Sequence, residues 1–79
     1  MFIVAALYHF TRFKDHQNIC SSLQNKCNVS GVKGSLLLAP EGINGTIAGT
    51  RRGIDSVLEY IRTLPGCGSI EHKESTASL

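Results

Sequence analysis

A short turn in the middle of the chain places the strongest limit on its fold. Pro40, Glu41 and Gly42 separate two apolar segments of strand length, Ser35–Ala39 and Ile43–Ala48. Proline presets φ at one turn position and glycine accepts a positive φ at another, so the two segments are expected to form a tight hairpin. The chain therefore contains an antiparallel strand pair at its centre.

A helix is expected on each side of this hairpin. Asp15 can cap the first, over residues 15–29, and Thr50 can cap the second, which ends at Leu64, Pro65 and Gly66. Each helix has one apolar stripe with helical spacing. The first stripe consists of Ile19, Cys20, Leu23 and Cys27, and the second of Ile54, Val57, Leu58, Ile61 and Leu64.

Two further strands complete the pattern. Phe2–Phe10 is rich in β-branched and aromatic residues, whereas Ser69–Lys73 has few apolar side chains and is expected at a sheet edge. The order strand, helix, strand, strand, helix, strand predicts the α+β class and a ferredoxin-like sandwich, in which two helices cover one face of an antiparallel sheet. The 79 residues suffice for a single domain of this kind, over residues 1–79.

The apolar runs raise the question of what covers the other face of the sheet. Leu36–Ala39 does not alternate between polar and apolar residues, which is typical of a central strand or of one covered on both faces. Phe2–Tyr8 is also nearly continuous. A further domain of a longer protein, or a second copy in a homodimer, is therefore expected there, and a self-sufficient domain stays open as an alternative. The polar end, Glu74–Leu79, is compatible with a linker.

Composition limits the location and the partners only loosely. Eight Lys and Arg residues against six Asp and Glu give a formal charge of +2, which permits contact with nucleic acid without indicating it. The apolar runs are far shorter than the roughly 20 residues that span a bilayer, so no membrane segment is expected. Met1–Val4 lacks the basic start and the cleavage site of a signal peptide, which favours the cytoplasm.

The segment Gly34–Gly49, with the sequence GSLLLAPEGINGTIAG, resembles the signature stretch of the rhodanese-containing tRNA uridine hydroxylases. Four other segments are similar to this family in order and spacing. They are the opening strand with Tyr8 and Phe10, Gly31–Gly34, Gly53–Val57 and Leu64–Gly66. The resemblance therefore covers nearly all of the chain.

The resemblance implies an acylphosphatase-like domain of ferredoxin-like fold, placed at the N-terminus of a longer protein and followed by a rhodanese-like domain. These enzymes hydroxylate the wobble uridine of certain tRNAs at carbon 5 with oxygen. Their reactive cysteine belongs to the rhodanese-like domain, which would follow Leu79, so Cys20, Cys27 and Cys67 do not inherit its role. A noncatalytic module is therefore expected, with tRNA and the rhodanese-like domain as partners and with no catalytic residue or cofactor of its own.

Two sets of residues are candidates for contact with tRNA. The first set consists of cations in loops or at the ends of elements, where they can reach phosphates, although an ordinary solvated surface explains them equally well. These are Arg12, Lys14, Lys33, Arg51 and Arg52. The second set is the signature hairpin, whose amides could bind a phosphate, but Glu41 opposes this, and a tight turn with a bulged strand is favoured. Its residues are Pro40, Glu41, Gly42, Asn44 and Gly45.

Two other functions of this fold have weaker support. Arg12 and Asn44 are the candidates for an acylphosphatase-type hydrolase, but the loop from His9 to Lys14 lacks the glycines that would bring amides around a phosphate. An RNA-recognition motif is rejected because the segment 43–49 has no aromatic residue for base stacking. Three aromatic residues of the first strand share one parity and are expected to form a core stripe instead. They are Phe2, Tyr8 and Phe10.

No metal site is indicated, because the three histidines are dispersed and none has a cysteine at a ligand spacing. Cys20 and Cys27 are seven residues apart on one helix and are expected to be small buried hydrophobes. Cys67 lies beside two glycines in a loop and is the thiol expected to be exposed.

Overall fold

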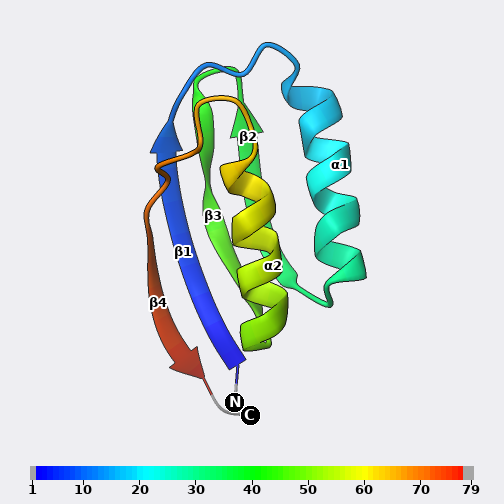
Figure 1. Ribbon diagram of the computed structural model, residues 1–79, viewed down its shortest axis with the longest axis vertical. Coiled ribbons are helices and arrows are strands. Elements are labelled where there is room, and N and C mark those ends of the chain that lie inside the picture. Colours follow the sequence, from blue (N-terminus) through cyan, green and yellow to red (C-terminus); the bar gives the residue numbers. More distant parts are fainter. Residues whose placement is uncertain (1, 78–79) are drawn as a thin grey trace.

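The computed structural model describes residues 2–77 and shows one antiparallel sheet of four strands with both helices on the same face (Figure 1). The elements are β1 Phe2–Phe10, α1 His16–Val29, β2 Lys33–Ala39, β3 Gly42–Gly49, α2 Arg51–Arg62 and β4 His72–Ala77. The strands lie in the order β2-β3-β1-β4, so β1 and β3 are central. The predicted α+β class and ferredoxin-like sandwich are confirmed. Within residues 2–77, neither helix has the length and apolar character needed to cross a membrane.

The central hairpin forms as predicted, but its two strands pair without an inserted residue, so the expected bulge at Gly45 is absent. Gly45 has a φ of +149°, and a Cβ at this position would overlap the carbonyl oxygen of Ser35 on β2. Glycine is needed here because the backbone of the neighbouring strand approaches closely.

The apolar stripe of α2 forms the centre of the core. Four of its side chains are at most 2% exposed and pack in one cluster with the helix-facing side chains of β1 and β3. The four are Ile54, Val57, Leu58 and Ile61, and the strand residues are Ala5, Leu7, Ile43 and Ile47. Burying one such large aliphatic side chain stabilises the fold by about 1.5–3 kcal/mol relative to leaving it in water. Thr50 caps the helix as predicted, because its hydroxyl oxygen accepts a hydrogen bond from the Gly53 amide at 3.0 Å.

The first helix, α1, contributes less to the core. Leu23 is its one buried side chain, whereas Ile19 and Cys27 are half-buried. The prediction that Cys20 is buried is wrong: this residue is exposed, because α1 lies over the edge strand β2 and, among residues 2–77, only α2 packs beside it. Asp15 occupies the N-cap position as predicted, but its carboxylate accepts a hydrogen bond from the Asn18 amide group at 2.8 Å rather than from the backbone.

The last strand lies later in the chain than the sequence predicts, at His72–Ala77 instead of Ser69–Lys73. Two turns delay it, since the Cys67 amide donates to the Leu64 carbonyl and the Ile70 amide donates to the Cys67 carbonyl. These turns place Cys67 and Ile70 in the core, so the prediction that Cys67 is exposed is also wrong. Residues 74–77 belong to β4 and are not a linker, and residues 78–79 of that expected linker lie outside the described residues.

The face of the sheet without helices, hereafter the open face, carries alternate residues of every strand. On β1, Ala5 and Leu7 face the helices, so Phe2, Tyr8 and Phe10 lie on the open face. Tyr8 is 62% exposed and Phe10 is 69% exposed. The prediction that these three residues form a core stripe is wrong, because the two helices cover only one face of the sheet.

The second strand also differs from its prediction. β2 is an edge strand, not a central strand or one covered on both faces. Leu36 and Leu38 are half-buried toward the helices, whereas Leu37 lies on the open face and is 68% exposed. An unbroken apolar run therefore arises here without burial of both its faces.

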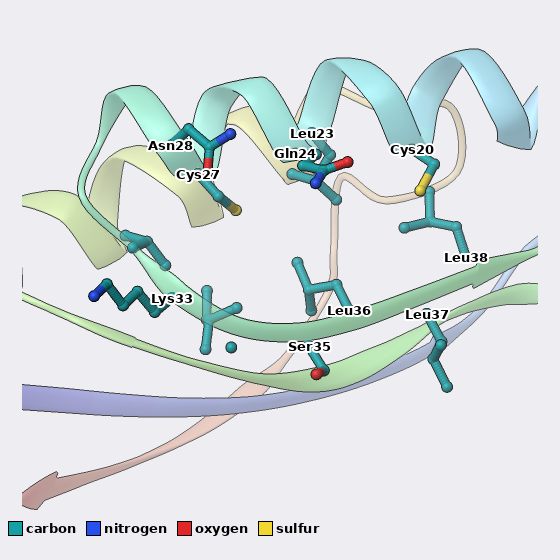
Figure 2. Close-up of a pocket in the computed structure, with 13 residues that line it drawn as sticks. Cys20, Leu23, Gln24, Cys27, Asn28, Lys33, Ser35, Leu36, Leu37 and Leu38 are labelled. Atoms are coloured by element: carbon teal, nitrogen blue, oxygen red, sulfur yellow. The ribbon is translucent and has the colours of Figure 1, made fainter.

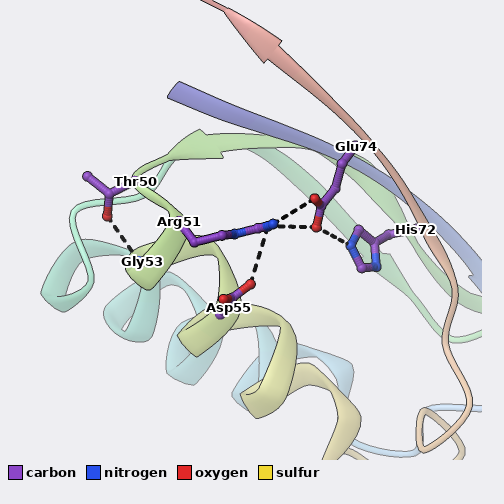
Figure 3. A network of polar contacts seen from close by, with 6 residues as sticks. All are labelled: Thr50, Arg51, Gly53, Asp55, His72 and Glu74. Atoms are coloured by element: carbon purple, nitrogen blue, oxygen red, sulfur yellow. Dashed lines mark hydrogen bonds and ion pairs between the residues drawn. The ribbon is translucent and has the colours of Figure 1, made fainter. Parts of the chain in front are cut away.

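An ion-pair network joins the start of α2 to β4 (Figure 3). Arg51 donates hydrogen bonds to both carboxylate oxygens of Glu74, at 2.8 and 2.7 Å, and lies 3.3 Å from the Asp55 carboxylate. The His72 ring lies 2.7 Å from the Glu74 carboxylate. The hydrogen bond with His72 and the charges of Arg51 and His72 hold the pKa of Glu74 below its ordinary value, and partial desolvation opposes this to a smaller extent.

Substitution of Gly45 by Ala is expected to lower the free energy of unfolding by about 1–3 kcal/mol, because the added Cβ must displace the backbone of β2. Gly68→Ala is the matched control, since a Cβ there meets nothing within 4 Å. Urea unfolding of both variants measures the difference. Equal losses of stability would contradict a requirement for close strand approach at Gly45.

Substitution of Glu74 by Gln is expected to flatten the acid dependence of stability. The unfolded chain, with its higher pKa near 4.5, binds more protons than the folded chain in the window between the two values, so stability falls as the pH drops through that window. The E74Q chain lacks this carboxylate and should lose less stability as the pH falls below about 5. Urea unfolding at several pH values tests this, with Glu59→Gln on the exposed side of α2 as control. Parallel pH curves for E74Q and the unsubstituted chain would contradict it.

Candidate nucleic-acid interface

The structure divides the five candidate cations between the two ends of the domain (Figure 1). Arg12 and Lys14 follow the end of β1, whereas Lys33 begins β2 and Arg51 and Arg52 begin α2 beside the start of β1. β1, with its nine residues, runs between these ends and spans roughly 27 Å. The cations therefore form two separate groups and not one basic patch.

At the α2 end, the two arginines differ in their surroundings. Arg51 is engaged by Glu74 and Asp55, so a phosphate would have to compete with two carboxylates for it. Its neighbour Arg52 is exposed, and the contacts of the described residues include no ion pair to it. Arg52 is therefore the more accessible cation of the pair, and contact of either arginine with RNA stays a prediction.

At the opposite end, the signature hairpin holds the loop between β1 and α1. The Thr11 amide donates to the Glu41 carbonyl at 3.1 Å, and the Phe13 amide donates to the Pro40 carbonyl at 2.9 Å. Phe13 itself is 3% exposed and anchors the loop in the core. Arg12 lies between these two anchored residues and Lys14 follows them, and both side chains are exposed to solvent.

The glycines of the signature hairpin have structural positions. Gly42 pairs with Phe10 of β1 and is buried, and Gly45 lies in the ladder between β1 and β2. A Cβ at either position would overlap a backbone carbonyl oxygen of the neighbouring strand. Asn44, between them, projects on the open face opposite Tyr8. These positions support the structural interpretation of the motif over a phosphate-binding nest.

Sequence reasoning missed an exposed aromatic pair. The rings of Tyr8 and Phe10 lie edge to face, with centroids 4.8 Å apart and planes at 79°. Phe10 lines a shallow hollow together with Arg12, Lys14 and Glu41. The alternation of residues along β1 could have predicted this pair. Tyr8 and Phe10 must lie on the face opposite to Ala5 and Leu7, and two helices can cover only one of the two faces of the sheet.

A groove of about 490 Å³ runs between α1 and the edge strand β2 on the helix side of the sheet (Figure 2). Leu36 and Leu38 point into it toward α1, whereas Leu37 points to the opposite side. Cys20 and Cys27 lie along its rim, and burial raises the pKa of the Cys27 thiol, as it does for Cys67 in the core. Burial disfavours the reactive thiolate of these two cysteines.

Comparison with known proteins agrees with the fold and the hairpin. The family described as "UPF0176 acylphosphatase like domain" matches residues 2–78. The chain is 60% identical, over 99% of its length, to a tRNA uridine(34) hydroxylase of Jannaschia sp. (strain CCS1). It is 56% identical, over 95% of its length, to the protein of that name from Roseobacter denitrificans (strain ATCC 33942 / OCh 114).

The chain spans 26% and 25% of the lengths of these two relatives. The resemblance that the segment Gly34–Gly49 indicates is therefore confirmed, and so is the acylphosphatase-like fold. With a match that extends over the whole sandwich, the chain belongs to the UPF0176 acylphosphatase-like domain family.

Proposed function

We propose that the chain is a noncatalytic module of a tRNA uridine hydroxylase, which helps to position tRNA or a following rhodanese-like domain for oxygen-dependent 5-hydroxylation of the wobble uridine. The observation that carries this proposal is the 60% identity to the Jannaschia enzyme over nearly the whole chain, against only 26% of that enzyme's length. Most of the relative is thus left to supply the reacting groups. The partners are tRNA and the rhodanese-like domain, and the location is the cytoplasm.

The surroundings of the thiols support a noncatalytic role. Burial raises the pKa values of Cys27 and Cys67, which disfavours the nucleophilic thiolate form. Cys20 is exposed on α1, at the rim of the groove beside β2. A positioning module needs none of these thiols to react.

The hydrogen bonds of the β1–α1 loop disfavour the acylphosphatase alternative. Binding of an acyl phosphate in this loop requires backbone amides that are free to point at the phosphate. The amides of Thr11 and Phe13 already donate to carbonyls of the hairpin. A cradle around Arg12 would have to break the contacts that hold the loop in place.

The first test is a titration of the chain with unmodified tRNA at several salt concentrations. The slope of log K against log salt is negative, and its magnitude is expected to fall by about 0.9 for each phosphate contact that is lost. Two double variants, R12A/K14A and R51A/R52A, compare the two ends of the domain. We expect the larger loss of slope in R12A/K14A, because Arg51 is already paired with two carboxylates.

Two results would contradict the positioning role. One is the absence of tRNA binding by the chain together with normal hydroxylation by a Jannaschia enzyme that lacks the equivalent segment. The other is concentration-dependent self-association of the chain that no RNA perturbs, which would favour a structural homodimer.

A further inference from the structure

The large exposed apolar side chains of the domain are concentrated on the open face. Within residues 2–77 there are four of them, and three lie on this face. These are Tyr8, Phe10 and Leu37. The rest of the open face of β2, β3 and β4 consists mainly of small or polar residues, such as Ser35, Thr46 and Ser75. On β1 every open-face residue is apolar, and Phe2 and Val4 are half-buried. The apolar patch is therefore a narrow stripe along β1, and its two most exposed rings, Tyr8 and Phe10, lie near the end of the sheet formed by the hairpin.

The aromatic pair has a hollow on each side, and each hollow contains cations. Phe10 borders the hollow that Arg12, Lys14 and Glu41 also line. Tyr8 borders a second hollow, between β1 and β4, that Lys73 and Glu71 also line. Three cations against two carboxylates give this surface a small positive charge, with the aromatic rings between the charged groups.

We propose that Tyr8 and Phe10 form a platform on which an unpaired base of RNA stacks, with Arg12 and Lys14 on the phosphates beside it. Because the two rings are nearly perpendicular, a base that lies flat against one ring stands edge-on to the other, which continues their edge-to-face packing. Stacking of bases on aromatic side chains is the general mode by which proteins bind single-stranded RNA. This platform differs from that of an RNA-recognition motif because both rings lie on one strand.

The chemistry of the patch favours RNA over a protein as the occupant. Within residues 2–77, the strongly exposed large apolar side chains of this face are only three, and β2, β3 and β4 surround them mainly with small and polar residues. Cations flank the rings on both sides, as binding to a phosphate chain requires. The relatives named above modify tRNA. The inference rests on the proposed function and assigns it a surface.

The test measures binding of unmodified tRNA to four single variants by fluorescence anisotropy. Y8A and F10A are each expected to weaken binding about tenfold, with no change in the salt slope, because stacking involves no counterion release. L37A is the matched control, being as exposed as Phe10 and on the same face, and is expected to bind within about twofold of the unsubstituted chain. F10W retains an aromatic face and is expected to keep the affinity. The chain contains no other Trp, so quenching of this indole by bound tRNA reports stacking directly.

The outcomes separate this inference from the proposed function. If Y8A and F10A bind tRNA as tightly as the unsubstituted chain, while R12A/K14A loses salt slope, the platform is wrong and the tRNA role stands. If the unsubstituted chain binds no tRNA even at low salt, the tRNA role fails and the platform fails with it. If Y8A, F10A and L37A all weaken association with the remaining three quarters of the Jannaschia enzyme and leave tRNA binding unchanged, the open face docks protein. Thermal unfolding of each variant confirms that the fold persists, as expected for truncation of exposed side chains.

Discussion

Packing of α2 against the two central strands is the interaction on which the rest of the domain depends. The helix buries four residues of its apolar stripe, Ile54 to Ile61, against Ala5, Leu7, Ile43 and Ile47, and this contact orients β1 and β3 with one face toward the helices. The residues that alternate with these four along β1 and β3 then have to face the opposite side of the sheet. The exposed aromatic pair on β1 is thus a consequence of the same packing that builds the core.

The signature hairpin organises the end of the domain at which it turns. Its glycines allow β1, β2 and β3 to approach closely, and two of its carbonyls accept hydrogen bonds from the β1–α1 loop. The loop is therefore held where Arg12 and Lys14 lie beside Phe10. The hairpin thus supports the β1–α1 loop. Arg12 and Lys14, which are candidates for contact with tRNA, come from that loop and not from the hairpin.

The opposite end of the domain has a different character. There the Arg51 guanidinium is held by Glu74 and Asp55, and this pairing ties the first turn of α2 to the edge strand β4. β4 carries almost no apolar residues, so an ion pair and the backbone ladder with β1 are what attach it. The exposed position of the network limits its contribution to stability. Arg51, which the sequence offers as a cation for contact with RNA, is thus paired with two carboxylates of the domain itself.

The sequence alone determined the local structure and the family. Helical spacing predicted α2 and its buried residues, Thr50 predicted its cap, and Pro40 to Gly42 predicted the hairpin, because these signals depend on neighbours only a few residues away. The segment Gly34–Gly49 indicated the family for the same reason, since it is a continuous stretch. The alternation of β1 could also have shown that Tyr8 and Phe10 share a face opposite to Ala5 and Leu7.

Only the tertiary structure decided that Tyr8 and Phe10 lie on the open face, where β4 begins, and which cysteine is buried. An apolar run such as Leu36–Leu38 has the same composition whether its strand is central or at an edge, and the strand order places it at an edge. Cys67 is buried because the turns after α2 fold back under the core, and no local pattern encodes that return. Arg51 binds Glu74, which lies 23 positions later in the sequence. The candidate cations lie at two opposite ends of the domain. Both arrangements depend on how the strands and helices pack in space, which the local sequence does not determine.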